Sequence, residues 1–146
     1  MMVDVTSEAI IARPRADVFA FASDPDNVPR WYANIKSVEW KTAPPLAIGS
    51  RIAFVAQFLG RRMAYTYEVV DLVPGQRLVM RTAEGPSPME TVYTFADDPA
   101  GTRMTLRNHG KPSGFSIVVA PMIAAAMRRA NRKDLELLKR LLEHGS

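Results

Sequence analysis

The sequence predicts an α+β fold in which a curved, seven-stranded antiparallel sheet wraps around one long C-terminal helix, with two short helices between the first and second strands. Two observations predict this fold. Strand-like segments follow one another almost without interruption from Ile35 to His109, and the later connections are short, as between antiparallel neighbours. Helical spacing then runs from roughly Gly114 to Glu143. With 146 residues and no linker, we expect a single domain over residues 1–146.

Composition is that of an ordinary globular protein: 47% of residues are hydrophobic and 23% charged, and the net charge is +4. The basic surplus lies in short clusters and forms no arm or long tract, so we expect no nucleic-acid partner. The absence of cysteine excludes disulfides, zinc–thiolate sites and cysteine nucleophiles. Neither of the two histidines lies at ligand spacing from a carboxylate. The sequence therefore predicts no metal site and no cofactor.

No targeting or membrane-spanning segment is predicted. Met1–Glu8 has neither a basic stretch nor an apolar core, so it does not resemble a signal peptide. The longest uncharged stretch, Pro112–Met127, spans 16 residues and is interrupted by Gly114 and Pro121. That is shorter than the roughly 20 apolar residues that a spanning helix needs. The expected location is the cytoplasm.

The N-terminal part of the chain predicts one strand and two short helices. Val3–Ala12 mixes Val, Thr and Ile, which is typical of a strand, and it ends at Arg13-Pro14. Proline suits the first turn of a helix over Ala16–Ala22. The cap-forming side chains and the proline of Ser23–Asp26 begin a second short helix, which is expected to reach Trp31-Tyr32.

Period-two alternation then predicts six strands, each with one apolar and one polar face. They are Ile35–Lys41, Ser50–Phe58, Met63–Leu72, Arg77–Thr82, Met89–Ala96 and Thr102–His109. Only the long C-terminal helix and the two short helices are available to cover the apolar face.

The predicted C-terminal helix has two unlike halves. Phe115–Met127 carries no charge, whereas the second half alternates Arg, Lys and Glu with Leu. Pro121 is expected to kink the helix or to mark a restart near Ala120. The expected inward stripe is Ile123, Met127, Ala130, Leu137 and Leu141, widened by Leu135, Leu138 and Leu142, with Arg128, Arg132, Glu136, Arg140 and Glu143 opposite.

The inward faces predict a cavity between sheet and helix. Three inward tyrosines each need a partner for a hydroxyl, the chain's eight methionines suit an adaptable wall, and Ala124–Ala126 leaves room in the helix. Leu106 and Thr82 are expected on the same surface, and Trp31 at its rim, where it either gates a pocket or seals the core. The predicted ligand-binding residues are Trp31, Phe54, Phe58, Tyr65, Tyr67, Met80, Thr91, Tyr93, Met104, Asn108, Phe115, Val119, Met122 and Ala126. The alternative is that these side chains simply fill a core.

No catalytic residue is predicted. His109 falls on the polar face of its strand, which favours a surface residue over an acid/base catalyst. Glu68 and Glu90 fall on the same face and are expected to form exposed ion pairs. Their expected partners are Arg77, Arg81, Arg103 or Arg107. Serine-nucleophile motifs, phosphate-binding glycine loops and dinucleotide fingerprints are absent.

The order strand, two short helices, six strands and long helix resembles the helix-grip fold. This is the superfamily of START-type lipid-transfer domains, the birch-pollen allergen and the polyketide cyclase/dehydrase-like (SRPBCC) proteins. The resemblance rests on Ile11–Phe19, Asp24–Trp31, Tyr67–Gly75, Gly101–Thr105 and Leu135–Lys139. It is greatest to the bacterial polyketide cyclase/dehydrase-like branch. That branch contains binders and enzymes alike, so the resemblance implies a cavity and little about chemistry.

Three functions are compatible with this sequence. The favoured hypothesis is a binding or carrier protein for a hydrophobic small molecule such as a lipid, polyketide or aromatic compound. The second is a cyclase or dehydrase in which an inward tyrosine or His109 moves a proton. The third is a protein-interaction module that uses the groove for a partner helix.

The sequence leaves open whether the protein is a monomer or a homodimer. The basic belt Arg128, Arg129, Arg132 and Lys133 is either a solvated helix face or a patch for transient contact with an anionic membrane.

Overall fold

The computed structural model describes residues 3–58, 60–84, 88–111 and 120–145, and these contain every predicted element. The elements are β1 (Val3–Ile11), α1 (Arg15–Ala22), the 3-10 turn η1 (Pro25–Asn27), α2 (Val28–Trp31), β2 (Ile35–Trp40), β3 (Arg51–Phe58), β4 (Arg61–Val73), β5 (Arg77–Glu84), β6 (Met89–Asp98), β7 (Gly101–Gly110) and α3 (Ala120–His144). The predicted helix start near Gly114 lies outside the described residues. Among the described helices, none combines the length and the apolar character that crossing a bilayer requires.

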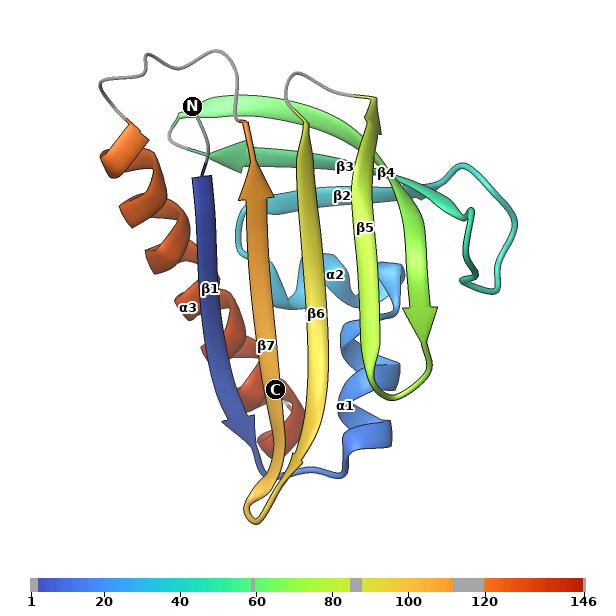
Figure 1. Ribbon diagram of the computed structural model, residues 1–146, viewed down its shortest axis with the longest axis vertical. Helices are drawn as coiled ribbons and strands as arrows, with labels where there is room; N and C mark the ends of the chain where they lie inside the picture. Colours follow the sequence, from blue (N-terminus) through green and yellow to red (C-terminus); the bar gives the residue numbers. More distant parts are fainter. Residues whose placement is uncertain (1–2, 59, 85–87, 112–119, 146) are drawn as a thin grey trace.

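The seven strands form one antiparallel sheet in the order β1-β7-β6-β5-β4-β3-β2. Strands that follow one another from β2 to β7 are neighbours, and β1 completes the sheet by pairing with β7. The register of β4 against β5 shifts at Thr66/Tyr67 and at Val69/Asp71, and such bulges bend a strand. Figure 1 shows the resulting curvature: β2 and β3 run across the direction of β6 and β7. The sheet therefore encloses a concave face.

The described helices α1, α2 and α3 lie on this concave side of the sheet (Figure 1). Pro14 directly precedes α1, and the Asp24 side chain accepts a hydrogen bond from the Asp26 backbone N–H at 3.0 Å at the start of η1. Pro121 is the second residue of the described part of α3, so the predicted kink or restart near Ala120 falls at the edge of the described residues. The predicted start signals are thus confirmed at α1 and η1.

The main core lies between the C-terminal half of α3 and the sheet. Leu135, Leu138 and Leu142 are all buried and belong to one cluster with Met104 and Leu106 of β7. They form the centre of the inward stripe, not its edge as predicted from the sequence. The five leucines between residues 135 and 142 occupy both sides of the stripe, so their spacing leaves the rotation of the helix undetermined.

The helix rotation also corrects three predicted inward residues. Leu137 and Leu141 are only partly buried and pack against the edge of the main cluster. Met122 is 68% exposed, whereas the next residue, Ile123, is 1% exposed. The prediction that Met122 faces the interior is therefore wrong, because adjacent helical residues point about 100° apart.

We expect Leu138→Ala to lower the free energy of unfolding by about 2–5 kcal/mol, because the substitution leaves a cavity at the centre of the contact between helix and sheet. Denaturant titration followed by circular dichroism measures this change. Glu136→Ala, at an exposed position on the same helix, is the control and should change stability by no more than about 0.5 kcal/mol. Equal stability of the two variants would contradict the described packing of α3.

Candidate functional site

A cavity of about 170 Å³ lies between the N-terminal half of α3 and the most strongly curved part of the sheet. β3, β4 and β7 form one wall, α3 forms the opposite wall, and the link from α2 to β2 closes one side. The lining residues are Tyr32, Asn34, Ile35, Phe54, Ala56, Met63, Tyr65, Tyr67, Met89, Asn108, Ile123, Met127, Ala130, Asn131 and Asp134. Most of this lining is apolar or aromatic.

An aromatic group from β3 and β4 forms the sheet side of the cavity. The Phe54 and Tyr67 rings meet edge to face with centroids 5.8 Å apart, and the Tyr65 and Tyr67 centroids are 6.0 Å apart. Period-two alternation places these side chains on the concave face, since Phe54 pairs with Tyr65 in the ladder between β3 and β4. The arrangement provides a rigid apolar surface for a ring or an alkyl chain.

The cavity continues inward to a smaller space of about 90 Å³ that Tyr93 of β6 helps to line. There the hydroxyl oxygens of Tyr32 and Tyr93 are 2.9 Å apart and hydrogen-bonded. Burial raises the pKa of both tyrosines well above the ordinary value, and it raises the pKa of Tyr67 to about 12. All three hydroxyls therefore remain protonated at neutral pH and act as neutral hydrogen-bonding groups.

A chain of polar side chains crosses the cavity from helix to sheet. Asn131 Nδ2 donates to Asn108 Oδ1, and Asn108 Nδ2 donates to Thr91 Oγ1, both at 2.8 Å. The Thr91 side chain also lies close enough to the Tyr67 hydroxyl to oppose the rise in its pKa. No described residue donates a hydrogen bond to Asn131 Oδ1, although this residue is 6% exposed. The cavity thus contains an amide oxygen without a donor.

Asp134 is the one acidic residue among the described residues that line this cavity. It is 2% exposed, and its Oδ1 accepts a hydrogen bond from the Ala33 backbone N–H at 3.0 Å. Within the described chain, no cation forms an ion pair with it and no residue donates to Oδ2. Burial raises the pKa of the carboxyl to about 6, and the hydrogen bond from Ala33 opposes the rise. A carboxyl group that titrates near neutrality therefore borders the cavity.

A shallower hollow of about 260 Å³ adjoins the cavity on the outer side of α3. Asn34, Ala130 and Asp134 line both spaces, so the two meet at the gap between the link from α2 to β2 and the helix. Ala126 and Ala130 keep that gap wide, because larger side chains there would fill it. The exposed residues Arg129 and Lys133 flank the hollow.

Seven of the fourteen sequence-predicted site residues line the cavity or its inner extension. They are Phe54, Tyr65, Tyr67, Met80, Thr91, Tyr93 and Asn108. Ala126 lines the adjoining hollow instead. Trp31 and Met104 are completely buried in the main core, so Trp31 seals the core rather than standing at a rim. The Phe58 side chain, Phe115 and Val119 lie outside the described residues.

Although Ile123, Met127 and Ala130 were expected on the inward stripe of the helix, the predicted ligand-binding set omits eleven residues that line the main cavity. They are Tyr32, Asn34, Ile35, Ala56, Met63, Met89, Ile123, Met127, Ala130, Asn131 and Asp134. The inward position of Asn131 and Asp134 could have been predicted, because they lie three residues apart, between Met127 and Leu138 on the inward face. Polar residues inside an apolar helical stripe are expected to face a partner or a cavity.

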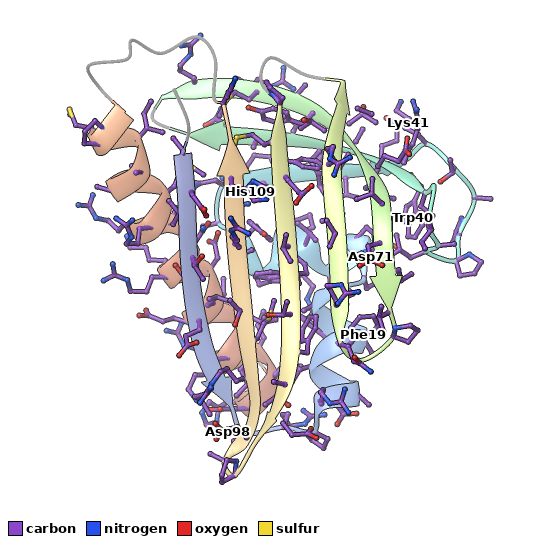
Figure 2. The ribbon with its side chains drawn as sticks, viewed as in Figure 1. Phe19, Trp40, Lys41, Asp71, Asp98 and His109 are labelled. Carbon is purple, nitrogen blue, oxygen red and sulfur yellow. The ribbon has the colours of Figure 1, made fainter. Side chains whose placement is uncertain are left out.

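The carboxylates considered from the sequence lie on the opposite face of the sheet. Glu90 contacts Arg81 at 2.7 Å and His109 Nε2 at 2.9 Å, and Figure 2 shows His109 on β7 in front of the helices. Glu68 pairs with Arg51 at 3.1 Å, and not with any of the four arginines proposed for it. Glu68 pairs with Arg51 because the two residues lie directly opposite each other in the ladder between β3 and β4.

A second hollow, of about 470 Å³, lies on the surface beside Phe19 and Trp40, which Figure 2 labels. Prolines form much of its lining, and its two carboxylates already accept hydrogen bonds. Asp26 accepts from Trp40 Nε1 at 2.9 Å, and Asp24 accepts from the Asp26 backbone. Although this hollow is larger, both of its carboxylates already have a hydrogen-bond donor, unlike Asp134 Oδ2 in the cavity under α3. In the part of the chain that the structure describes, no group of three potential metal ligands is present.

Comparison with solved structures shows the same fold over nearly the whole chain. A protein from Thermus thermophilus has a TM-score of 0.83 and 19% identity, and the match covers 98% of this chain and 99% of that one. The Zhui aromatase/cyclase from Streptomyces sp. R1128 has a TM-score of 0.80 and 17% identity, with coverage of 98% and 94%. A START superfamily protein from Mycobacterium smegmatis has a TM-score of 0.77 and 15% identity, with coverage of 99% of each chain. The helix-grip fold predicted from the sequence is confirmed.

Sequence comparison gives a family as well as a fold. No curated protein matches the chain. The family model described as polyketide cyclase / dehydrase and lipid transport matches residues 2–143. That match spans every element of the sheet and nearly all of α3. The chain therefore belongs to the polyketide cyclase / dehydrase and lipid transport family.

Proposed function

We propose that the protein binds and carries a small hydrophobic molecule in the cavity between the sheet and α3. The observation that carries the proposal is the cavity itself, which has aromatic walls and a few polar groups at one side. Small-molecule sites in proteins have this composition: apolar surface supplies most of the affinity, and a few polar atoms fix the orientation. The adjoining hollow would serve as the opening, because it meets the cavity at Ala130.

The placement of Asp134 supports the same proposal. A buried carboxyl without a cationic partner destabilises a fold, because its ionised form loses hydration that nothing replaces. Among the described residues, only the Ala33 N–H donates to Asp134, so the protein itself satisfies the ionised carboxyl poorly. Binding sites commonly retain such groups at the expense of stability. A ligand that donates to the carboxyl would remove the penalty.

A cyclase or dehydrase is the second candidate, and one observation favours it. The hydrogen-bonded hydroxyls of Tyr32 and Tyr93 lie close enough to Asp134 for the carboxylate to raise the pKa of both tyrosines. Proton transfer to a bound carbonyl compound needs such a donor near a group that titrates close to neutrality. Product formation from a poly-β-ketone that is lost in Tyr93→Phe, with ligand binding retained, would establish this candidate.

The exposed basic belt gives the carrier a means of meeting lipid surfaces. Arg128, Arg129, Arg132 and Lys133 are all exposed on α3, and two of them flank the hollow. Basic clusters are attracted to anionic membranes by about 1 kcal/mol per residue. Transient membrane contact through this belt is therefore part of the proposal.

Filling the cavity should abolish binding. We expect Ala130→Phe to lower the affinity for a hydrophobic fluorescent probe by about tenfold or more, because the new ring occupies the space at the opening. Ala125→Phe adds the same ring on the exposed face of α3 and is the matched control. Fluorescence titration of the three proteins measures the effect, and organic extraction with mass spectrometry identifies any co-purified molecule. Equal probe binding by wild type and Ala130→Phe, or an empty protein that ignores every probe, would contradict the proposal.

The carboxyl of Asp134 should make stability depend on pH in a defined direction. Its folded pKa of about 6 lies above the ordinary value of 3.8, so the folded protein holds this proton more tightly than the unfolded chain. The contribution is therefore fully present at acidic pH and is lost as the pH rises through about 6. A rise of this size corresponds to about 3 kcal/mol.

Asp134→Asn removes this titration, and we expect the variant to become progressively more stable than wild type between about pH 4 and pH 7. Urea unfolding of both proteins at a series of pH values measures the difference, in which other titrating groups cancel. A difference in unfolding free energy that does not change with pH would show that Asp134 is not buried as described.

A further inference from the structure

Two polar atoms on the helix side of the cavity lack a hydrogen-bond donor, and this restricts the ligand. Asp134 Oδ2 and Asn131 Oδ1 both lack a donor among the described residues. They belong to residues three positions apart on the inward side of α3, so they face the same space. Both atoms are hydrogen-bond acceptors. A ligand that satisfies them must supply hydrogen-bond donors.

The charged residues around the cavity also favour a ligand that donates hydrogen bonds. No lysine, arginine or histidine is among the described residues that line the cavity or its inner extension. Arg129 and Lys133 border only the outer hollow, where both are exposed and neither pairs with Asp134. An ionised Asp134 therefore gives the cavity a negative charge, and no described residue that lines the cavity or its inner extension carries a positive charge.

The aromatic rings that line the cavity are a third observation that restricts the ligand. The rings of Tyr32, Phe54 and Tyr67 line the same cavity as Asp134. The faces of aromatic rings attract cations, and this attraction grows when water is excluded. A carboxylate beside several aromatic rings is the combination that holds an ammonium group with an apolar substituent.

We infer that the cavity selects hydrophobic amines, in which an apolar body packs on Phe54 and Tyr67 and a protonated nitrogen donates to Asp134 Oδ2 and Asn131 Oδ1. The inference rests on the proposed function and specifies its ligand class. A neutral alcohol supplies a single donor and no charge. A fatty or aromatic carboxylate places a second negative charge beside Asp134 and binds least well.

Three naphthalene derivatives of similar shape test the inference: 1-naphthylmethylamine, 1-naphthalenemethanol and 1-naphthoate. Isothermal titration calorimetry near neutral pH should show the amine binding about tenfold or more tightly than the alcohol, with the carboxylate weakest. Asp134→Asn should abolish the preference for the amine over the alcohol. Glu136→Gln, which removes an exposed carboxylate two residues further along α3, is the matched control and should keep the wild-type order.

The wild-type protein supplies a second test that needs no variant. Protonation of Asp134, whose pKa is about 6, should weaken amine binding as the pH falls below that value, while alcohol binding stays constant. The amine remains protonated throughout this range. The other titratable groups facing the carboxyl are Tyr32, which directly follows α2, Tyr93 on β6, and Arg129 and Lys133 at the hollow; burial keeps both tyrosines protonated at these pH values. His109 lies on the opposite face of the sheet with Glu90.

The outcomes separate the ligand class from the proposed function. Amine preference that depends on Asp134 and on pH supports the inference. If 1-naphthoate binds as tightly as the amine, or if Asp134→Asn keeps the preference, the inference is overturned and the carrier function stands. If none of the three compounds binds and extraction of the purified protein yields no small molecule, the proposed function fails as well.

Discussion

The contact between α3 and the concave face of the sheet is the constraint on which the structure depends. A curved sheet exposes a large apolar face, and this helix is the only long element among the described residues that covers it. The leucines of its C-terminal half satisfy that requirement and are buried against β7. The N-terminal half presents Ala126, Ala130 and Asn131, which are too small or too polar to fill the same curvature. The cavity follows from this difference between the two halves of one helix.

The same contact sets the chemistry of the cavity. Because α3 faces the sheet along its whole length, any polar residue on its inward side is removed from water and must find a partner within the protein or a ligand. Asn131 finds Asn108, whereas Asp134 finds only the Ala33 backbone. The cost of an ionised Asp134 is tolerable because the leucine contact stabilises the fold elsewhere. Stability from the leucine contact thus permits an unfavourable group directly before it on the same helix.

Most of the cavity residues that were predicted from the sequence were placed by strand alternation. A period of two assigns each residue to a face, so Phe54, Tyr65 and Tyr67 could be placed inward without knowing which strands pair. The helix was harder, because leucines on both sides of the stripe hid its rotation, and Met122 was placed inward by mistake. Trp31 and Tyr32 show a different limit: Trp31 ends α2 and Tyr32 follows it directly, yet Trp31 is buried in the core and Tyr32 lines the cavity. Their roles depend on how α2 docks, which local sequence does not specify.

The most direct measurement is a high-resolution electron-density map of the purified protein. We expect the space between Phe54, Tyr67 and Asp134 to contain density for a bound small molecule or for ordered water, with Ala130 beside an opening to solvent. Side chains of Met127, Tyr65 and Ile123 interlocked across that space, with Asp134 turned outward to solvent, would contradict the existence of a binding cavity under the helix.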